Sequence, residues 1–303
     1  MVNLKIDGQK ISVPAGTTIL EAAEKVGIKI PHLCYLKDIN EIAACRVCLV
    51  EKVGMEKLVT ACNTEVEEGV EILTNSPRVR EVRRINVELI LSDHDCKCVQ
   101  CVKSGNCTLQ RISNDLGIIE QPYKNIHEVN RWDFDLPIIR EASKCVKCLR
   151  CVQICDKIQG LNIWDITGSG YRASVGVGNN KKITNADCAL CGQCITHCPV
   201  GALRERDDIG LLRDALADPD KITMVQIAPA IRTAWAEGID ISKTEATTGK
   251  LVSALRRIGF DYIFDTTYTA DLTIMEEGSE FIERFTHKED YSWPMFTSCC
   301  PGW

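Results

Sequence analysis

The chain has 303 residues, enough for two to four modules, and its formal net charge of −6 argues against nucleic acid as a partner. Its 18 cysteines would suit a disulfide-stapled secreted protein, but the N-terminus is polar and has no apolar signal core. The cysteines also come in tight C-x2-C pairs, which suit metal chelation. No apolar run approaches the roughly 18 residues of a membrane helix. We therefore expect a cytoplasmic protein without membrane insertion, α+β and multi-domain.

Residues 1–76 are predicted to form a small sheet wrapped around one helix. Two short apolar runs flank Asp7-Gly8, which is a strong signal for a β-hairpin. Thr18 and Glu21 then have the spacing of a capping box at the start of a helix.

Four cysteines in this region have the spacing C-x10-C-x2-C-x13-C: Cys34, Cys45, Cys48 and Cys62. The pattern resembles a plant-type 2Fe–2S ferredoxin module with a β-grasp fold, although its first gap is longer than the plant C-x4-C. A zinc ribbon is the alternative. It is disfavoured because a ribbon uses two C-x2-C pairs and only one is present here.

Residues 77–118 are predicted to begin with a helix, because Ser76 suits an N-cap and Pro77 suits the first helical position. Apolar residues then recur at roughly helical spacing. Three arginines lie between them and are expected to form a solvated face: Arg80, Arg83 and Arg84.

The helix leads into the pattern H-x3-C-x2-C-x5-C, formed by His94, Cys98, Cys101 and Cys107. Three cysteines are one ligand short for a 4Fe–4S cluster, so we expect the histidine to supply the fourth. Cys96 is the alternative ligand, but it lies two residues from Cys98 and would make a cramped chelate. An imidazole in place of a thiolate removes one negative charge and alters the redox potential of the cluster.

Residues 119–136 carry no metal signal and are expected to be a linker, whereas residues 137–209 hold two C-x2-C-x2-C-x3-C runs. This tandem is typical of two-cluster 4Fe–4S ferredoxins, in which the fourth cysteine of each run binds the other cluster. One predicted ligand set is Cys145, Cys148, Cys151 and Cys198, and the other is Cys188, Cys191, Cys194 and Cys155.

Two glycine-containing segments match nucleotide-binding motifs only in part. Gly168–Ala173 fits a dinucleotide fingerprint by letter, but no strand–turn–helix frames it, so we expect a turn-rich insertion. Gly249-Lys250 is no P-loop, because Leu251 stands where Ser or Thr is needed. We therefore expect neither a flavin nor a nicotinamide on this chain.

From residue 210 to residue 303 the pattern becomes α/β. The predicted elements are a buried strand over Ile222–Ile227, a helix over Lys250–Ile258, a strand over Phe260–Phe264 and a helix over residues 269–286.

The final heptapeptide, T-S-C-C-P-G-W, resembles the first active-site motif of the iron-only (FeFe) hydrogenases. The preceding order of modules resembles the large multi-cluster form of that family. The resemblance implies that residues 210–303 begin an α/β hydrogenase catalytic domain. It also implies that Cys300 ligates the 4Fe–4S part of the catalytic H-cluster and that Cys299, beside the diiron part, is the first proton-relay group.

The same resemblance implies two further site segments. Met275–Glu280 fits the M-E-E-x-x-E stretch of the family, which points to Glu277 and Glu280 as a proton path. Ile227–Ala230 looks like the loop that packs against the diiron unit, so Pro229 and Ala230 would contact that cofactor.

The chain departs from the family in lacking two further motifs, which would supply three more cysteines and a lysine. The sixteen assigned ligands suit one 2Fe–2S and three 4Fe–4S clusters. Only Cys96, Cys299 and Cys300 are left unassigned, which is too few for another cluster, so an H-cluster is expected only in a complete protein. The resemblance implies ferredoxin or flavin- and Fe–S-bearing NAD(P)-linked subunits as electron partners. The alternatives are the front end of an NAD-linked formate dehydrogenase or complex I-like large subunit, and a non-catalytic electron-transfer subunit.

Overall fold

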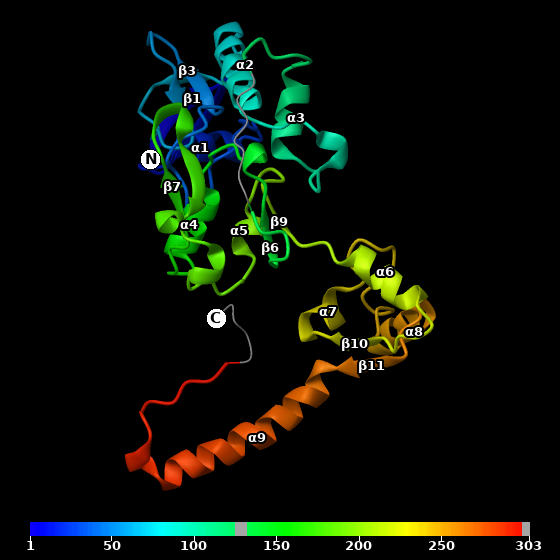
Figure 1. Cartoon of the computed structure of the whole chain (residues 1–303). Coiled ribbons are helices and arrows are strands. Elements are labelled where there is room, and N and C mark those ends of the chain that lie inside the picture. The colour runs from blue at the N-terminus through cyan, green and yellow to red at the C-terminus, as the bar shows by residue number, and fades with distance from the viewer. Residues whose placement is uncertain (125–131, 299–303) are drawn as a thin grey trace. The chain divides into compact units, whose positions relative to one another are not determined.

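The computed structural model describes residues 1–124 and 132–298 and divides them into two compact units (Figure 1). The first unit is Met1–Arg206, and the second begins at Asp207. None of the helices in the described residues combines the length and apolarity needed to cross a bilayer.

The first unit begins with a five-stranded mixed sheet in the order β2-β1-β5-β3-β4. Its strands are β1 (Val2–Ile6), β2 (Gln9–Val13), β3 (Leu49–Lys52), β4 (Val59–Thr60) and β5 (Glu71–Leu73). β1 and β2 pair antiparallel through the predicted hairpin, where Asp7 and Gly8 both have positive φ, as the favoured two-residue turn requires. β1 also pairs parallel with β5. The predicted small sheet is therefore present.

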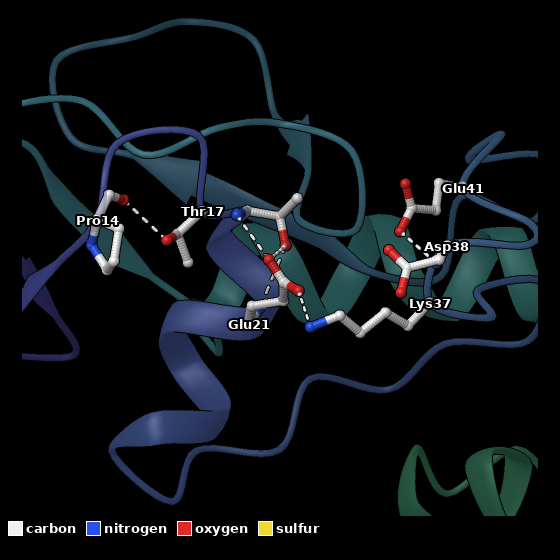
Figure 2. A network of polar contacts seen from close by, with 7 residues as sticks. Pro14, Thr17, Glu21, Lys37, Asp38 and Glu41 are labelled. Atoms are coloured by element: carbon white, nitrogen blue, oxygen red, sulfur yellow. Dashed lines mark hydrogen bonds and ion pairs between the residues drawn. The ribbon is translucent and has the colours of Figure 1, made fainter.

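Helix α1 (Ile19–Lys25) packs its apolar face on this sheet and has the predicted capping box. The Thr18 hydroxyl accepts from the Glu21 N–H, and the Glu21 carboxylate accepts from the Thr18 N–H. Figure 2 shows that the same carboxylate also binds Lys37, whose Nζ lies 2.8 Å from Glu21 Oε1. The Lys37 ammonium, with the Thr18 N–H, lowers the pKa of Glu21. The loop that follows Cys34 is thereby tied to the start of α1.

Helix α2 (Pro77–Ser92) begins as predicted, with the Ser76 hydroxyl accepting from the Val79 N–H. The prediction of a solvated arginine face is wrong for Arg83, which is 4% exposed, whereas Arg80 and Arg84 are exposed. Arg83 donates to the carbonyls of Val47, Leu49 and Thr74 at 2.8–3.0 Å. Arg83 lies four residues after buried Val79, so it shares the inward face of the helix.

After the 3₁₀ turn Cys98–Gln100 comes helix α3 (Thr108–Asp115), and the chain then enters the segment predicted to be a linker. Residues 125–131, within that segment, lie outside the described residues. Trp132, at its far end, stacks on Trp164 with ring centroids 6.0 Å apart.

The remainder of the first unit is built from two strand pairs and two helices. They are β6 (Ile138–Arg140) antiparallel to β9 (Leu203–Glu205), β7 (Trp164–Thr167) antiparallel to β8 (Ser174–Val177), and helices α4 (Arg150–Lys157) and α5 (Gln193–Thr196). Gly168–Ala173 forms the connection between β7 and β8. It therefore lies in a strand–turn–strand and not in a nucleotide-binding strand–turn–helix.

The second unit has a parallel pair of strands and four helices among its described residues. They are α6 (Ile209–Ala217), β10 (Met224–Ile227), α7 (Pro229–Ala234), α8 (Thr248–Ile258), β11 (Tyr262–Asp265) and α9 (Thr266–Thr286). The predicted α/β character is thus confirmed, but the expected burial of the first strand is not. Ile222 and Met224 are 71% and 66% exposed, and only Ile227 of β10 is buried. Among the described residues this sheet has two strands, and the alternate residues of both strands are exposed, so one of its faces is uncovered.

The burial of Arg83 gives a stability prediction. Arg83→Met removes three hydrogen bonds to carbonyls in and beside the sheet, and we expect it to lower the free energy of unfolding by about 2 kcal/mol or more. Urea unfolding followed by circular dichroism measures the change. Arg80→Met, on the exposed side of the same helix, is the matched control, and an equal effect of the two substitutions would contradict this role for Arg83.

Candidate iron–sulfur centres

The first predicted ligand set forms two pairs of thiols. Cys34 Sγ lies 3.5 Å from Cys45 Sγ, and Cys48 and Cys62 are near enough that each shifts the pKa of the other. Cys34 follows α1, the Cys45–Cys48 loop enters β3, and Cys62 follows β4, so segments from three parts of the module bring the set together. Two pairs of thiols suit a cluster with two irons, each held by one pair.

The second set lies between helices α2 and α3. His94 follows the end of α2 and is 7% exposed, and its Nδ1 lies 2.9 Å from the Lys144 carbonyl oxygen. A ring that donates from Nδ1 carries a lone pair on Nε2, the form in which histidine binds metals. Burial, with repulsion from the Cys107 and Cys101 thiols, raises the pKa of Cys98.

Cys96, the alternative to His94, is exposed. Its Sγ donates to the His94 carbonyl oxygen at 3.4 Å.

The third and fourth sets each line one hollow in residues 137–209, the predicted two-cluster module. Cys145, Cys148, Cys151 and Cys198 line the first hollow, and Cys155, Cys188, Cys191 and Cys194 line the second. The fourth cysteine of each run thus lies with the first three of the other run. Helix α4 explains this exchange, because Cys151 and Cys155 are one turn apart on it and line different hollows.

The backbone turns sharply beside the predicted ligands. Ten described residues other than glycine have positive φ, and five of these ten lie within two positions of a predicted ligand: Ala43, Arg46, Lys147, Leu149 and Leu190. This left-handed conformation costs roughly 1 kcal/mol or more for each such residue. Its concentration around the cysteines indicates loops shaped for a bound group.

The charge state of the thiols also fits a metal group. The hydrogen bond from Cys34 lowers the pKa of Cys45 to about 5, whereas burial raises the pKa of Cys148 and of Cys194 to about 12. Buried thiolates of like charge are costly unless a cation compensates them. Iron binds the thiolate form and releases the proton, so these sites suit iron–sulfur clusters.

A single metal ion fits the described residues less well. Within residues 1–124 and 132–298, no three His, Cys, Asp or Glu side chains are grouped so that they could hold one ion. A tetrahedral zinc site with bonds of about 2.3 Å draws its four sulfurs to about 3.8 Å from one another. The hollows lined by four cysteines each, with no such grouping around one ion, suit a cluster of several iron and sulfur atoms.

The second and third sets are in contact through the segment Cys198–Gly201. Cys107 Sγ approaches the Pro199 carbonyl oxygen at 3.9 Å, and the Thr108 N–H donates to the same oxygen at 3.2 Å. A Cβ atom added at Gly201 would lie 2.4 Å from Cys101 Sγ. Position 201 therefore admits glycine alone unless the Cys101 thiol moves.

The site residues predicted in the second unit lie on two helices. Pro229 and Ala230 open α7, and Glu277 and Glu280 lie three residues apart on α9. Glu280 is paired with Arg284, and Glu277 Oε1 accepts from the Thr297 hydroxyl at 3.1 Å. Among the described residues, the polar partners of these two glutamates are Thr297 and Arg284, and not Pro229 or Ala230.

Cys299 and Cys300 lie outside the described residues.

Sequence reasoning missed the residues that hold the ligand loops. Asn40 donates a hydrogen bond to the Cys34 carbonyl oxygen, and Arg150, from another module, donates one to the Tyr35 carbonyl oxygen. Gly201 leaves the space that the Cys101 thiol occupies. Only Gly201 had a local signal, as a glycine shortly after a cluster cysteine and its proline. The contacts of the other two join residues far apart in sequence.

The contact at Gly201 gives a second prediction. A free thiol at Cys101 could rotate away from a new methyl group, but a thiolate fixed to a cluster could not. We therefore expect Gly201→Ala to lose one 4Fe–4S cluster, about four irons per chain, with the other clusters retained. Iron and sulfide analysis with EPR measures this. Gly176→Ala, where an added Cβ meets nothing within 4 Å, is the control, and full iron content in Gly201→Ala would refute the argument.

Four known families match successive parts of the chain. Residues 1–77 match the 2Fe-2S iron-sulfur cluster binding domain, and residues 83–122 match the NADH-ubiquinone oxidoreductase-G iron-sulfur binding region. Residues 137–204 match the ferredoxin-like domain of NADH-quinone oxidoreductase subunit 3. Residues 221–303 match the C-terminal domain of the iron only hydrogenase large subunit.

A solved structure shares the fold over much of the chain. The crystal structure of NAD+-reducing NiFe-hydrogenase in the H2-reduced state has a chain that matches with a TM-score of 0.63. The match covers 82% of this chain and 99% of that one at 23% identity, so it shows the fold alone.

Two hydrogenases match over the whole chain. The NADP-reducing hydrogenase subunit HndD of Solidesulfovibrio fructosivorans is 43% identical, and iron hydrogenase 1 of Clostridium pasteurianum is 35% identical. The chain spans about half the length of these relatives, 54% and 53%. The alpha subunit of NADPH-Fe(3+) oxidoreductase from Geobacter sulfurreducens is 36% identical over 67% of the chain. The chain therefore belongs to the iron-only hydrogenase large subunits that carry a multi-cluster N-terminal region, and its residues 221–303 match part of their C-terminal domain.

Proposed function

We propose that this chain is the electron-relay portion and part of the catalytic domain of an iron-only hydrogenase. The complete protein would interconvert protons and electrons with H2. The observation that carries the relay is the exchange of the fourth cysteine between the two hollows, since this arrangement is that of two-cluster ferredoxins. The match of residues 221–303 favours hydrogenase over a formate dehydrogenase or complex I-like continuation.

Four clusters would be held by the sixteen predicted ligands. The mixed sheet over α1 suits a β-grasp module whose two thiol pairs hold 2Fe–2S, and His94 with three cysteines would hold the first 4Fe–4S cluster. Each cluster, when bound, accepts and donates one electron. The protein positions the thiolates, excludes water from the buried ones and sets the local charge.

The electron partner would be ferredoxin or a flavin- and Fe–S-bearing NAD(P)-linked subunit. The relative HndD is named a subunit of an NADP-reducing hydrogenase, which supports the second of these. No nucleotide motif in its proper context is present here, so the nucleotide would bind to the partner.

In the second unit, the proposed roles follow the family resemblance. Cys300 would ligate the H-cluster, and Cys299, Glu277 and Glu280 would pass protons, with Pro229 and Ala230 packed against the diiron part. The hydrogen bond between Glu277 and Thr297 supports part of this path, because Thr297 lies two residues before Cys299.

The ligand assignment predicts the iron content. The reconstituted chain should bind about fourteen irons, and His94→Ala should bind about ten or show an altered 4Fe–4S signal. Cys96→Ser should keep the full content, because its thiol is exposed and bonds to a backbone carbonyl. Iron analysis and EPR after anaerobic reconstitution measure both. The reverse result would assign the fourth ligand to Cys96.

The proton-relay assignment predicts a split between activity and metal content in the complete enzyme. Cys299→Ser should lower hydrogen turnover about a hundredfold or more, since a positioned proton-transfer group contributes on that scale, while iron content stays nearly unchanged. Cys300→Ser should instead lose the catalytic cluster. Hydrogen evolution and iron analysis on the same preparations measure the two effects, and equal iron loss in both variants would reject the relay role of Cys299.

A further inference from the structure

One buried amide joins the loops of two different ligand sets. Asn40 is fully buried, and its Nδ2 donates to the Cys34 carbonyl oxygen at 2.7 Å and to the Cys148 carbonyl oxygen at 2.9 Å. A primary amide has two N–H donors, so both are used. Cys34 belongs to the proposed 2Fe–2S site and Cys148 to a 4Fe–4S site, 114 positions later by residue number.

A second side chain makes the same connection from the other module. Arg150, the first residue of α4, donates from Nε to the Cys34 carbonyl oxygen at 3.3 Å and from Nη2 to that of Tyr35 at 2.8 Å. Lys157, near the end of α4, donates to the Ile39 carbonyl oxygen at 2.7 Å. Helix α4 thus binds the segment that runs from Cys34 to Asn40.

The orientation of the Asn40 amide that allows this bridge leaves its oxygen without a hydrogen bond in the described part of the chain. Its Oδ1 is buried and has no hydrogen-bond partner among the described residues. A buried acceptor without a partner destabilises the fold. The two carbonyls, which can only accept, fix the amide in this orientation.

Arg150 also places a charge between the two sites. The thiols that act on its guanidinium come from both ligand sets, Cys148 and Cys198 on one side and Cys34 and Cys45 on the other. Burial lowers the pKa of Arg150 and these thiols oppose that shift. Arginine stays protonated in proteins, so the charge is fixed.

We propose that Asn40 and Arg150 form a bridge that positions Cys34 and Cys148 and gives the two cluster sites one shared positive charge. The proposal rests on the proposed function, because it needs clusters at both sites. A cluster gains one negative charge when it is reduced, so a fixed cation nearby stabilises the reduced form of each. Arg150 therefore raises both reduction potentials, and Asn40 keeps the two sites at a fixed separation.

The charge is tested with Arg150→Gln, which keeps N–H donors and removes the charge, and Arg150→Lys, which keeps the charge. EPR-monitored redox titration of the reconstituted chain gives both midpoint potentials. We expect Arg150→Gln to change the ratio of oxidised to reduced cluster about tenfold at each site, which lowers each midpoint potential by about 59 mV for a one-electron couple. Arg150→Lys should restore most of each midpoint potential.

Lys157→Gln is the matched control, because Lys157 lies on the same helix and contacts the same segment but is exposed, so that water screens its charge. It should leave both potentials close to those of the unchanged protein. An Arg150→Gln variant with intact clusters and unshifted potentials, or with only one shifted, would overturn the shared charge.

The positioning role is tested with Asn40→Leu, which has a similar size and no donors. The magnetic interaction between the two reduced clusters, read from EPR line broadening and relaxation, should weaken because the two segments separate. Asn40→Ser, which keeps one donor, should give a magnetic interaction weaker than that of the unchanged chain and stronger than that of Asn40→Leu. It replaces Asn40→Leu in the test if Asn40→Leu does not fold. An unchanged interaction in both would overturn this role.

If the unchanged chain lacked either cluster, the proposed function would fail and the bridge with it, whereas intact clusters without these shifts would reject the bridge alone.

Discussion

The first unit depends on gathering thiols in buried hollows, which is unfavourable for the protein by itself. Thiolates of like charge repel one another, and burial removes the water that would otherwise solvate them. The chain meets this constraint with backbone shape and with donors. Left-handed residues such as Lys147 and Leu149 turn the loop around Cys148, and buried side chains such as Arg83 hold the loop that carries Cys45 and Cys48. The hydrophobic clusters of this unit pack directly against many of the same cysteines.

The parts of this fold that depend on short-range patterns could be predicted from sequence. The hairpin at Asp7-Gly8, the cap at Ser76 and the exchange of fourth cysteines all follow from residues within a few positions of one another or from a known spacing. Helix α8 and helix α9 in the second unit follow from periodicity in the same way.

The parts that depend on which distant segment covers a face could not be predicted. Arg83 carries a charge, which favours a solvated position, and only the carbonyls of β3 and of Thr74 make it a buried donor. The run Ile222–Ile227 has the composition of a buried strand, but burial requires neighbouring elements that the described part of the second unit does not provide. Asn40 and Arg150 likewise look like ordinary loop and helix residues until the two modules are seen in contact.

The contact between Gly201 and Cys101 has a consequence for the order in which the protein can be made. The side of the histidine-containing site where Cys101 lies is bounded by Gly201, which the ribosome adds one hundred residues later. His94 depends in the same way on the later Lys144 carbonyl. A chain emerging from the ribosome therefore presents the ligands of this site long before their enclosure exists. Metal insertion there must wait for the downstream module, or proceed first on an open, water-exposed loop.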